Sequence, residues 1–516
     1  MIDRRIFIKW ALGCGIGSLL DISKAEICAG RQVSKQAQNT DILLIGSGPA
    51  ALSIAHRLAG TGMKITIMES GFVRAHAETR KLAAVVPDGS GYPFDLQRAC
   101  QRTVGGSSVI WGGLCPRLLP SDFRSGSIGG YGRDWPISHE ELEPYYCEAE
   151  RLLQVGSGFV RSSAIQAKCL ESLASPYRRS SESLIRDLAA KGIGKTTAAS
   201  VCRNAQGEYQ PFNFKRRIAP AVMRDKNIVF MLGATVRRLV RKGDRVTGAL
   251  YSTLEGKEGL LDSRIIIICG GGIQNARLLL LSADPGRPDG LGNGSGHVGK
   301  WFMEHPHQRL WIKASKGIKR KELEPTMVHS YYWYDGLKKK GLGAMLVRMQ
   351  IYSDIPEWAM TEARPAGNIL LDCLCEQSGL AANRITLDSQ KKDQFGDLLP
   401  RLSYRLAPID LQTLAEGRKM IEPLIDSYGG NAVSEPLGYG SHLIGTTRMS
   451  AKDSGGVVDR NLKVFGTDNL YVAGSSVFPS SGAANPTLTL SALSLRLADH
   501  IVQRHGKGKL TPKMGM

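Results

Sequence analysis

Apolar residues recur along the chain in short runs that end at glycine, and the clearest run lies at residues 40–58. It consists of a polar lead-in, an apolar stretch of strand length, a glycine-containing turn and a segment whose apolar residues recur at helical spacing. A second apolar run at 64–68 ends at Glu69. The pattern therefore predicts a strand, a helix and a second strand in that order, which is a β-α-β unit.

The turn of this unit carries three small residues, Gly46, Gly48 and Ala51. Gly46 permits a tight turn, Gly48 lets a pyrophosphate approach the backbone, and Ala51 lets the helix pack on the strand. Glu69 stands 23 positions after Gly46, where an acidic residue would meet the ribose hydroxyls of a dinucleotide. Because the N-terminus of the helix would face the phosphates, the arrangement predicts a dinucleotide-binding site.

Later segments complete the same sheet, although they lie far along the chain. Apolar runs between 227 and 272 predict a β-meander that returns to a parallel strand, and this strand ends at Gly270. Residues 469–475 form another apolar run that ends at Gly474. The domain that binds the dinucleotide is therefore expected to be discontinuous in sequence.

The chain is expected to be an α/β protein of two domains. The segments assigned to a Rossmann-type, dinucleotide-binding domain are 37–135, 216–305 and 437–505. The stretches 136–215 and 306–436 lack strand-helix punctuation and are richer in aromatic residues, so we expect a second, substrate-binding α+β domain there, built on an antiparallel sheet. The ends, 1–36 and 506–516, are expected to be a leader with a linker and a basic tail.

Composition narrows the class of protein. The chain has 516 residues, beyond the size at which one hydrophobic core stops growing, and its 42% hydrophobic and 22% charged residues exclude a disordered chain and a polytopic membrane protein. The net charge of +20, from 67 basic and 47 acidic residues, lies in short clusters that form no nucleic-acid recognition module. A solvated basic surface and docking to an acidic electron-transfer partner both remain open.

The first residues resemble an export signal. Arg4 and Arg5 are followed by Phe7 and Lys9, and the stretch 10–20 is weakly apolar and too short to span a bilayer. The pattern resembles a twin-arginine signal, and the alternative is an amphipathic N-terminal helix. We expect export by the twin-arginine route, a periplasmic or other extracytoplasmic location, and no membrane span in the mature chain.

The cysteines give no sign of a metal centre or of a disulfide framework. Ten cysteines in a chain of this length are too few and too scattered for such a framework. Cys373 and Cys375 have no second pair at metal-ligand spacing, and Cys202 stands alone in its segment. The sequence thus offers ligands for neither zinc nor an iron-sulfur cluster, and we expect no metal site.

Several motifs together resemble the glucose-methanol-choline (GMC) family of FAD oxidoreductases, and the resemblance extends from about residue 38 to 502. Besides the Rossmann turn, the matching segments are 102–113, 134–137, 142–146, 442–449, 456–459, 469–476 and 482–489. The segments after 442 are the most specific part. Within the family the chain looks closest to pyranose oxidases and to the flavin subunits of bacterial sugar dehydrogenases.

The resemblance implies an FAD-dependent oxidoreductase that acts on CH-OH groups. The family's base matches His442, and the second member of its pair matches Asn485, which precedes Pro486 and Thr487 at the expected start of a helix. An imidazole suits the removal of a hydroxyl proton near neutral pH, the flavin N5 would take the hydride, and Asn485 would orient the hydroxyl. The N–H groups at that helix terminus would stabilise the negative charge of the reduced flavin. His305 is the rival for the role of base, but its place in the domain-crossing segment favours a structural role.

Further contacts with FAD are implied by the same resemblance. They are Arg102, Gly105, Gly106, Ser107, Ser108, Trp111, Gly112, Gly113, Val236 and Ser475, in addition to Gly46, Gly48, Ala51, Glu69, Gly270, Gly474, Pro486 and Thr487. Pyranose oxidases tether FAD through a histidine where this chain has Ile110, so we expect noncovalent FAD. Some sugar dehydrogenase subunits carry a cysteine cluster where this chain offers only Cys202, so electrons should leave the flavin directly.

The expected activity is the oxidation of a sugar or glycoside hydroxyl to a ketone, with electrons passed to an external acceptor. The expected partners are a small-molecule alcohol, a small subunit, and a cytochrome or quinone acceptor, with no nucleic acid. Three alternatives stay open: an oxidase that reduces oxygen to hydrogen peroxide, a flavin subunit docked to a cytochrome complex, and a lyase with an idle flavin.

Overall fold

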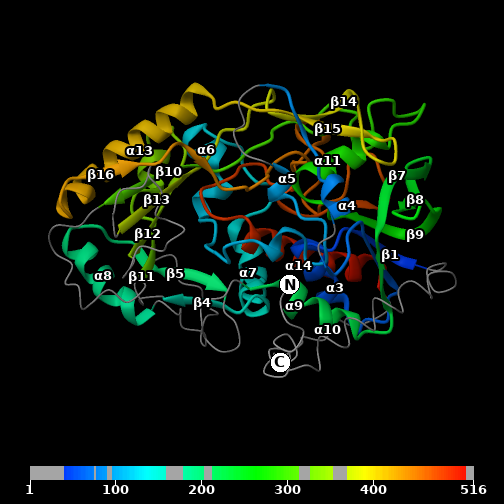
Figure 1. Ribbon diagram of the computed structural model, residues 1–516, viewed down its shortest axis with the longest axis horizontal. Helices are drawn as coiled ribbons and strands as arrows, with labels where there is room; N and C mark the ends of the chain where they lie inside the picture. The colour runs from blue at the N-terminus through cyan, green and yellow to red at the C-terminus, as the bar shows by residue number, and fades with distance from the viewer. Residues whose placement is uncertain are drawn as a thin grey trace, which may run out of the picture.

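The computed structural model of the protein describes residues 40–74, 77–89, 96–158, 178–202, 212–312, 326–351 and 369–506. The expected leader at 1–36 lies outside these ranges, as does all of the basic tail except Gly506. Within them the chain forms sheets of seven, eight and three strands, with helices between and around them (Figure 1). The mixed α/β class predicted from the sequence is confirmed.

The seven-stranded sheet contains the predicted β-α-β unit. Its strands run in the order β6-β2-β1-β9-β8-β7, and β18 pairs with β9. The bounds of these strands are β1 Thr40–Ile45, β2 Ile65–Glu69, β6 Ile228–Leu232, β7 Ala234–Lys242, β8 Arg245–Thr253, β9 Glu258–Ile268 and β18 Leu470–Val472. The first half of β9 pairs antiparallel with β8, and its second half lies between β1 and β18 in parallel pairing. The sheet is therefore Rossmann-like on one side and a meander on the other.

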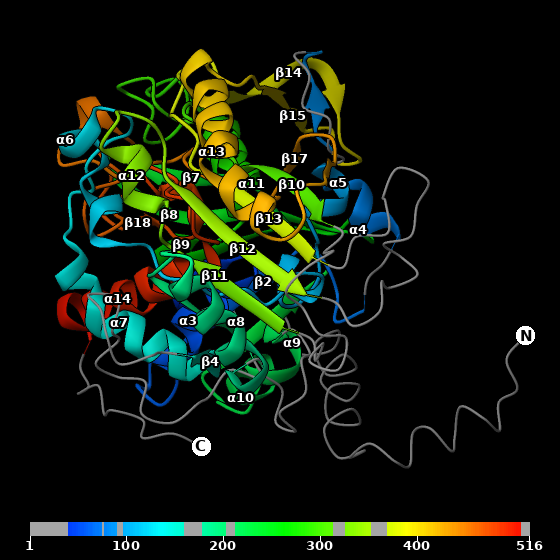
Figure 2. The same ribbon diagram turned by 90° about the vertical axis from the view of Figure 1, so that its left-hand side faces the viewer.

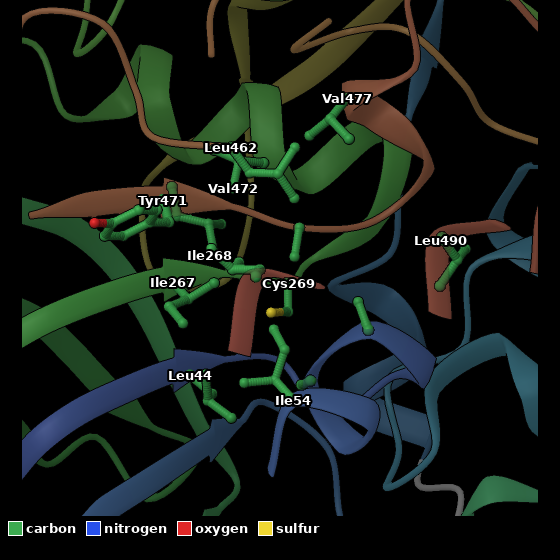
Figure 3. Close-up of a cluster of buried hydrophobic side chains, with 14 of the residues drawn as sticks. Leu44, Ile54, Ile267, Ile268, Cys269, Leu462, Tyr471, Val472, Val477 and Leu490 are labelled. Carbon is green, nitrogen blue, oxygen red and sulfur yellow. The ribbon is translucent and has the colours of Figure 1, made fainter. Parts of the chain in front are cut away.

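The core of this domain forms where the parallel strands meet helices α3 (Pro49–Leu58), α11 (Gly271–Leu281) and α14 (Thr487–His505). In Figure 3, Leu44 of β1, Ile267 and Ile268 of β9 and Val472 of β18 lie together beside Ile54 of α3. Because helices and loops cover both faces of these strands, the strands are continuous apolar runs, which is why the sequence pattern identified them.

The eight-stranded sheet is antiparallel throughout and forms the second domain. Its order is β16-β10-β13-β12-β11-β5-β4, with β17 also paired to β10. The bounds are β4 Val155–Gly158, β5 Thr196–Cys202, β10 Pro306–Ile312, β11 Thr326–Ser330, β12 Met345–Ile351, β13 Ile369–Cys375, β16 Ala432–Ser434 and β17 Gly438–Tyr439. Helices α8 (Arg178–Ala190) and α13 (Pro408–Ser427) pack on it, and Figure 2 shows α13 lying across β10, β12 and β13.

Alternate residues of the second sheet face two different environments. On β13, Ile369, Leu371 and Cys373 contribute to a hydrophobic cluster with α8 and α13. The intervening positions include Asp372 and Leu374, which point away from this cluster. Since side chains alternate across a strand, one face of the sheet is covered by helices and the other faces the Rossmann-like domain.

Shorter elements connect the two sheets. Helix α7 (His139–Leu152) packs on α14, and the three-stranded sheet of β3 (Val86–Pro87), β14 (Arg384–Lys392) and β15 (Leu398–Ser403) packs on α11. Residues 139–152 and 384–403, which the sequence assigns to the substrate-binding domain, thus contact helices of the first domain. The remaining short helices are α4 Ala77–Lys81, α5 Leu96–Ala99, α6 Ser125–Gly129, α9 Phe214–Arg217, α10 Ala219–Met223 and α12 Tyr334–Lys338.

Two further properties of the described residues concern membranes and cysteines. None of their helices is both long and apolar enough to cross a membrane. Cys147 of α7 is disulfide-bonded, whereas Cys100, Cys115, Cys269, Cys373 and Cys375 are free.

Candidate active site

A cavity of 670 Å³ lies between the two large sheets. Its wall includes Gly46 and Gly48 after β1, Gly270 after β9, Asn485 before α14 and Asp372 of β13. Cavities of this size are typical of sites for small molecules and cofactors. In addition, open α/β sheets bind ligands at the carboxyl ends of their parallel strands, which is where this cavity lies.

The glycines of the first turn differ in what surrounds them. Gly46 has a φ of 101°, and a Cβ added there would lie 2.7 Å from the carbonyl oxygen of Cys269. Only glycine is therefore tolerated at this position. A Cβ added at Gly48 would meet no described protein atom within 4 Å, so this backbone is open toward the cavity.

The carboxylate of Glu69 ends β2 and holds the same turn. One oxygen accepts hydrogen bonds from the Ser47 amide at 3.0 Å and from its hydroxyl at 2.7 Å, and the other accepts one from the Gly71 amide at 2.8 Å. Burial raises the pKa of Glu69, while the hydrogen bond from Ser47 opposes this shift. The side chain lines the cavity as the sequence predicts, and it also fixes the conformation of the glycine turn.

Arg102 supplies positive charge beside Glu69. Its Nη1 donates to the Ser70 hydroxyl at 2.8 Å, whereas its buried Nε has no hydrogen-bond partner among the described residues. Burial, followed by repulsion from Arg277, lowers the pKa of Arg102 to about 10, so the guanidinium is still charged at neutral pH. A buried charged donor without an acceptor indicates a place for an acceptor group of a ligand.

All but two of the residues assigned to FAD or to catalysis line this cavity. Those in its wall are Gly46, Gly48, Glu69, Arg102, Gly106, Ser107, Ser108, Trp111, Gly112, Gly113, Val236, Gly270, His442, Gly474, Ser475, Asn485, Pro486 and Thr487. Ala51 is instead fully buried in the core, where its small side chain lets α3 pack, and Gly105 has a φ of 91° at the preceding turn. Ile110, on which the expectation of noncovalent FAD rests, also lies in the wall and is 57% exposed.

At the other end of the cavity, His442 is hydrogen-bonded to His305, which is buried behind it. The Nδ1 atoms of the two rings are 2.7 Å apart, and Nε2 of His305 lies 2.9 Å from the carbonyl oxygen of Gly482. Because a carbonyl can only accept, Nε2 of His305 carries a proton. Nδ1 of a neutral His305 is then an acceptor, and Nδ1 of His442 is the donor. His442 is thereby held in the tautomer whose Nε2 carries no proton.

The electrostatics of this histidine pair favour the neutral forms. Burial lowers the pKa of His305 to about 4, although the carbonyls of Ser481 and Gly482 oppose the shift. Burial, followed by repulsion from His305, lowers the pKa of His442 well below its usual value. Both rings are therefore neutral at neutral pH, and Nε2 of His442 is available as a base.

The surroundings of His442 place its Nε2 beside the start of a helix. Nδ2 of Asn485 lies 3.1 Å from this nitrogen and donates to its lone pair. Helix α14 begins at Thr487, one residue later than the sequence indicates, with Pro486 as its N-cap. Ser441, next to His442, has a φ of 58°, a left-handed conformation that non-glycine residues adopt mainly where the surrounding structure enforces it.

The second sheet adds a charged cluster that the sequence reasoning missed. His307, Arg309, Arg348 and Asp372 all line the cavity, from the three neighbouring strands β10, β12 and β13. These side chains occur at alternate positions of strands that are otherwise largely apolar. A charged residue inside such a strand was the available signal, but the pairing of the strands was needed to bring the four together.

The residues present fit FAD. Gly48, Gly112 and Gly271 line the cavity, and a Cβ at any of them would enter space that no described atom occupies. The open backbone at Gly48 and the N-terminus of α3 would hold the pyrophosphate, and Glu69, at the end of β2, would face the ribose hydroxyls. Nowhere in the described ranges are three or more His, Cys, Asp or Glu side chains arranged to hold a metal ion.

The names of similar characterised proteins describe enzymes that act on alcohols and sugars. A 2-methyl-1,2-propanediol dehydrogenase of Mycolicibacterium austroafricanum is 27% identical over 538 aligned residues, which cover 92% of this chain and 97% of the relative. The fructose dehydrogenase large subunit of Gluconobacter japonicus is 22% identical, covering 91% of this chain and 99% of that one. A C-glycoside 3-oxidase of Microbacterium trichothecenolyticum is 24% identical, with 89% and 96% covered.

Solved structures share the fold. A formate oxidase of Aspergillus oryzae superposes with a TM-score of 0.64 at 18% identity, covering 91% of this chain and 99% of that chain. The pyridoxine 4-oxidase of Mesorbium loti gives a TM-score of 0.61 at 17% identity, with 90% and 100% covered.

Family models extend this likeness to the regions that form the cavity. The N-terminal GMC oxidoreductase model matches residues 41–307, which contain the dinucleotide turn, and the C-terminal model matches 380–494, which contain His442 and Asn485. Together they span both ends of the cavity and most of the chain. The protein thus belongs to the GMC oxidoreductase family, as an FAD-dependent enzyme that acts on alcohol or sugar hydroxyl groups.

Proposed function

We propose that the protein is a dehydrogenase that oxidises a secondary hydroxyl of a sugar or glycoside to a ketone, with His442 as the base. The observation that carries the proposal is the Nε2 atom of His442, unprotonated, in the wall of the cavity and 3.1 Å from Asn485. FAD, when bound, supplies the two-electron acceptor that the oxidation of an alcohol needs.

The chain's own residues handle the proton. Nε2 of His442 accepts the hydroxyl proton of the substrate, and the amide of Asn485 holds the same hydroxyl in place. Once it has accepted the proton, His442 is positively charged. Its hydrogen bond to His305 then becomes charge-assisted and therefore stronger. The carbonyl of Gly482 keeps His305 in the tautomer that accepts this bond.

The electron acceptor is proposed to be a quinone or a cytochrome, reached directly from the flavin. The name of the fructose dehydrogenase large subunit supports a partner subunit, whereas the names of several other relatives are those of oxidases. An oxidase that produces hydrogen peroxide and a flavin subunit docked to a cytochrome complex are the alternative forms of the proposal. Turnover with oxygen alone, compared with turnover with an artificial quinone or a cytochrome under argon, separates them.

Export by the twin-arginine route is part of the proposal. Its support is the Arg4-Arg5 motif, which lies outside the described residues, and the disulfide at Cys147, since disulfides persist mainly in oxidising compartments. Fractionation of cells that make the native chain or an Arg4→Lys, Arg5→Lys variant tests it. Retention of the variant in the cytoplasm is expected, and equal export of both proteins would contradict it.

The base is tested by anaerobic bleaching of the oxidised flavin band. Monosaccharides, glycosides and polyols are screened with the native protein, and the best substrate is then given to His442→Ala. The variant is expected to retain FAD and to lose flavin reduction. Bleaching of the variant at the native rate would show that another group removes the proton.

A further inference from the structure

We propose that Arg348 and Arg309 form a subsite for a carboxylate carried by the substrate, so that the enzyme acts on a hydroxylated acid such as an aldonate or a uronate. The inference rests on the proposed function, because it concerns what the same cavity binds. Its starting point is a group of charged side chains on the second sheet, opposite the dinucleotide turn.

The strand register brings these side chains together. On neighbouring strands, Arg309 of β10 and Arg348 of β12 both stand opposite Asp372 of β13. Arg348 forms a hydrogen bond and ion pair with Asp372, and Nε of Arg309 lies 3.5 Å from the same carboxylate oxygen. The other oxygen of Asp372 contacts Nδ1 of His307 at 2.5 Å. Asp372 thus anchors both guanidinium groups at the cavity wall.

The carboxylate of Asp372 is ionised and fully used. Burial alone would raise its pKa, but Arg348 and His307 hold the pKa well below its usual value. Both of its oxygens already have partners within the cluster. It therefore acts as the fixed counter-charge of the arginines and has no vacant oxygen to offer a ligand.

The two guanidinium groups, in contrast, have more N–H donors than Asp372 can accept. Nε of Arg309 and Nε of Arg348 are buried, and neither has a hydrogen-bond acceptor in the described part of the chain. An arginine has five N–H donors, and one carboxylate cannot satisfy two such groups. Both side chains line the cavity, Arg309 with 38% and Arg348 with 15% of the side chain exposed, so the acceptors for their remaining Nη donors are expected on the molecule that fills the cavity.

Charge decides what kind of acceptor fits. In the described wall of the cavity at this end, two arginines, Arg309 and Arg348, share one carboxylate, Asp372. Glu435 lies outside the wall, 3.9 Å from Arg309, and accepts a hydrogen bond from Trp311. A guanidinium binds a planar carboxylate through two parallel hydrogen bonds and with charge complementarity, whereas a neutral hydroxyl offers neither.

The neighbouring His329 does not change the charge of this cluster. His329 of β11 stands opposite Arg348, and its buried Nδ1 also has no hydrogen-bond partner among the residues described. Burial, followed by repulsion from Arg348, lowers the pKa of His329 to about 3, so this ring is neutral. His329 therefore offers Arg348 no counter-charge.

The subsite and the base share one cavity. His442 lines the same cavity as the arginines, and Arg348 is close enough to shift its pKa. One small molecule can thus place a carboxylate on the arginines and a hydroxyl at Nε2 of His442. The substrate class indicated by this arrangement is a small polyhydroxylated acid.

Binding is tested by difference spectroscopy of the oxidised flavin on the FAD-loaded His442→Ala variant, which is expected to bind substrates without reducing the flavin. The probes are matched pairs that differ only in the carboxylate, D-gluconate against D-glucitol and D-glucuronate against D-glucose. The acid of at least one pair is expected to bind about 10- to 100-fold more tightly than its neutral partner, as charged hydrogen bonds allow. Equal binding, tighter binding of the neutral compounds, or no binding of any probe would overturn the subsite.

Variants assign the preference to the arginines. Arg348→Gln and, separately, Arg309→Gln are expected to reduce the preference for the acid to about twofold or less. Arg241→Gln is the control, because Arg241 is about as buried as Arg348, pairs with Asp284 and lies outside the cavity wall. A preference that survives both cavity variants would refute the assignment. Acids that bind but never bleach the flavin of the native enzyme would instead contradict the proposed oxidation and leave the subsite standing.

Discussion

The hydrogen bond between His305 and His442 leads to a testable prediction about the rate of flavin reduction. Replacement of His305 by Phe removes the acceptor that fixes the proton on Nδ1 of His442, while a ring still fills the site. His442 is then free to adopt the tautomer in which Nε2 is protonated and cannot act as a base. Flavin reduction by the substrate should therefore slow, although the Phe side chain does not touch the cavity.

The expected size of the effect comes from the contact itself. The two nitrogens are 2.7 Å apart and buried, and loss of one partner of such a bond costs about 1–3 kcal/mol. Since about 1.4 kcal/mol is a factor of ten in rate, the rate constant for flavin reduction should fall about 5- to 150-fold. His305→Gln, whose amide oxygen can accept the same proton, should recover part of this loss.

The assay is anaerobic stopped-flow bleaching of the flavin band across a range of pH. Protonated His442 donates a charge-assisted hydrogen bond to neutral His305, so loss of this acceptor should lower the pKa of His442 further and move the acid limb of the profile to lower pH in His305→Phe. A purely structural role for His305 would not move this limb. His139→Phe is the control, because His139 packs on Phe123 and Tyr146 away from the cavity wall. A reduction rate within twofold of native, at full FAD content and with an unchanged profile, would refute the tautomer argument.

Three further predictions concern other parts of the molecule. Gly48→Ala should leave the apoprotein as stable as native but weaken FAD binding by tenfold or more, because the added Cβ enters only the space of the ligand. Gly46→Ala should instead lower the melting temperature of the apoprotein, because its added Cβ meets the backbone of Cys269. Lys338→Met should cost about 3–5 kcal/mol in the free energy of unfolding, since it leaves two buried carboxylates without their cation. The native reduction rate should stay level as pH falls through 6.5, because the lowered pKa keeps His442 neutral there, and should decline only at more acidic pH.

Each of these predictions has a defined contrary result. Equal losses of apoprotein stability in Gly48→Ala and Gly46→Ala would show that both glycines serve the fold alone. Lys340→Met is the control for Lys338→Met, since Lys340 is 55% exposed and its loss should change stability by about 0.5 kcal/mol or less. Similar denaturation curves for the two lysine variants would contradict the importance of the buried pair. An acid limb centred at or above pH 6.5 would contradict a base with a lowered pKa.

Most of the Rossmann-like domain could be predicted because its signals are local. The strand before Gly46, the helix after it and the strand that ends at Glu69 are contiguous, and their apolar spacing depends on local burial alone. Likewise, the runs that end at Gly270 and Gly474 are short buried strands followed by a required turn. These elements lie where the sequence predicts them.

The histidine pair and the arginine cluster could not be predicted in the same way. His305 and His442 are 137 positions apart, and the sequence favours a structural role for His305 without indicating which residue it contacts. The structure instead places it in a hydrogen bond with the predicted base. Arg348 and Asp372 meet only through the register of β12 and β13, and no local pattern encodes which strand lies beside which.

The pairing of β18 with β9 has a consequence for how the protein is made. β18 spans Leu470–Val472, so the parallel sheet stays one strand short until nearly the whole chain has left the ribosome. Contacts between such distant segments form late, because the long intervening loop must close first. The nascent chain therefore exposes the apolar edge of β9 throughout synthesis, and stable retention of the flavin must come after translation. Fragments that end before β18 should aggregate or be degraded rather than accumulate as a half-built flavoprotein.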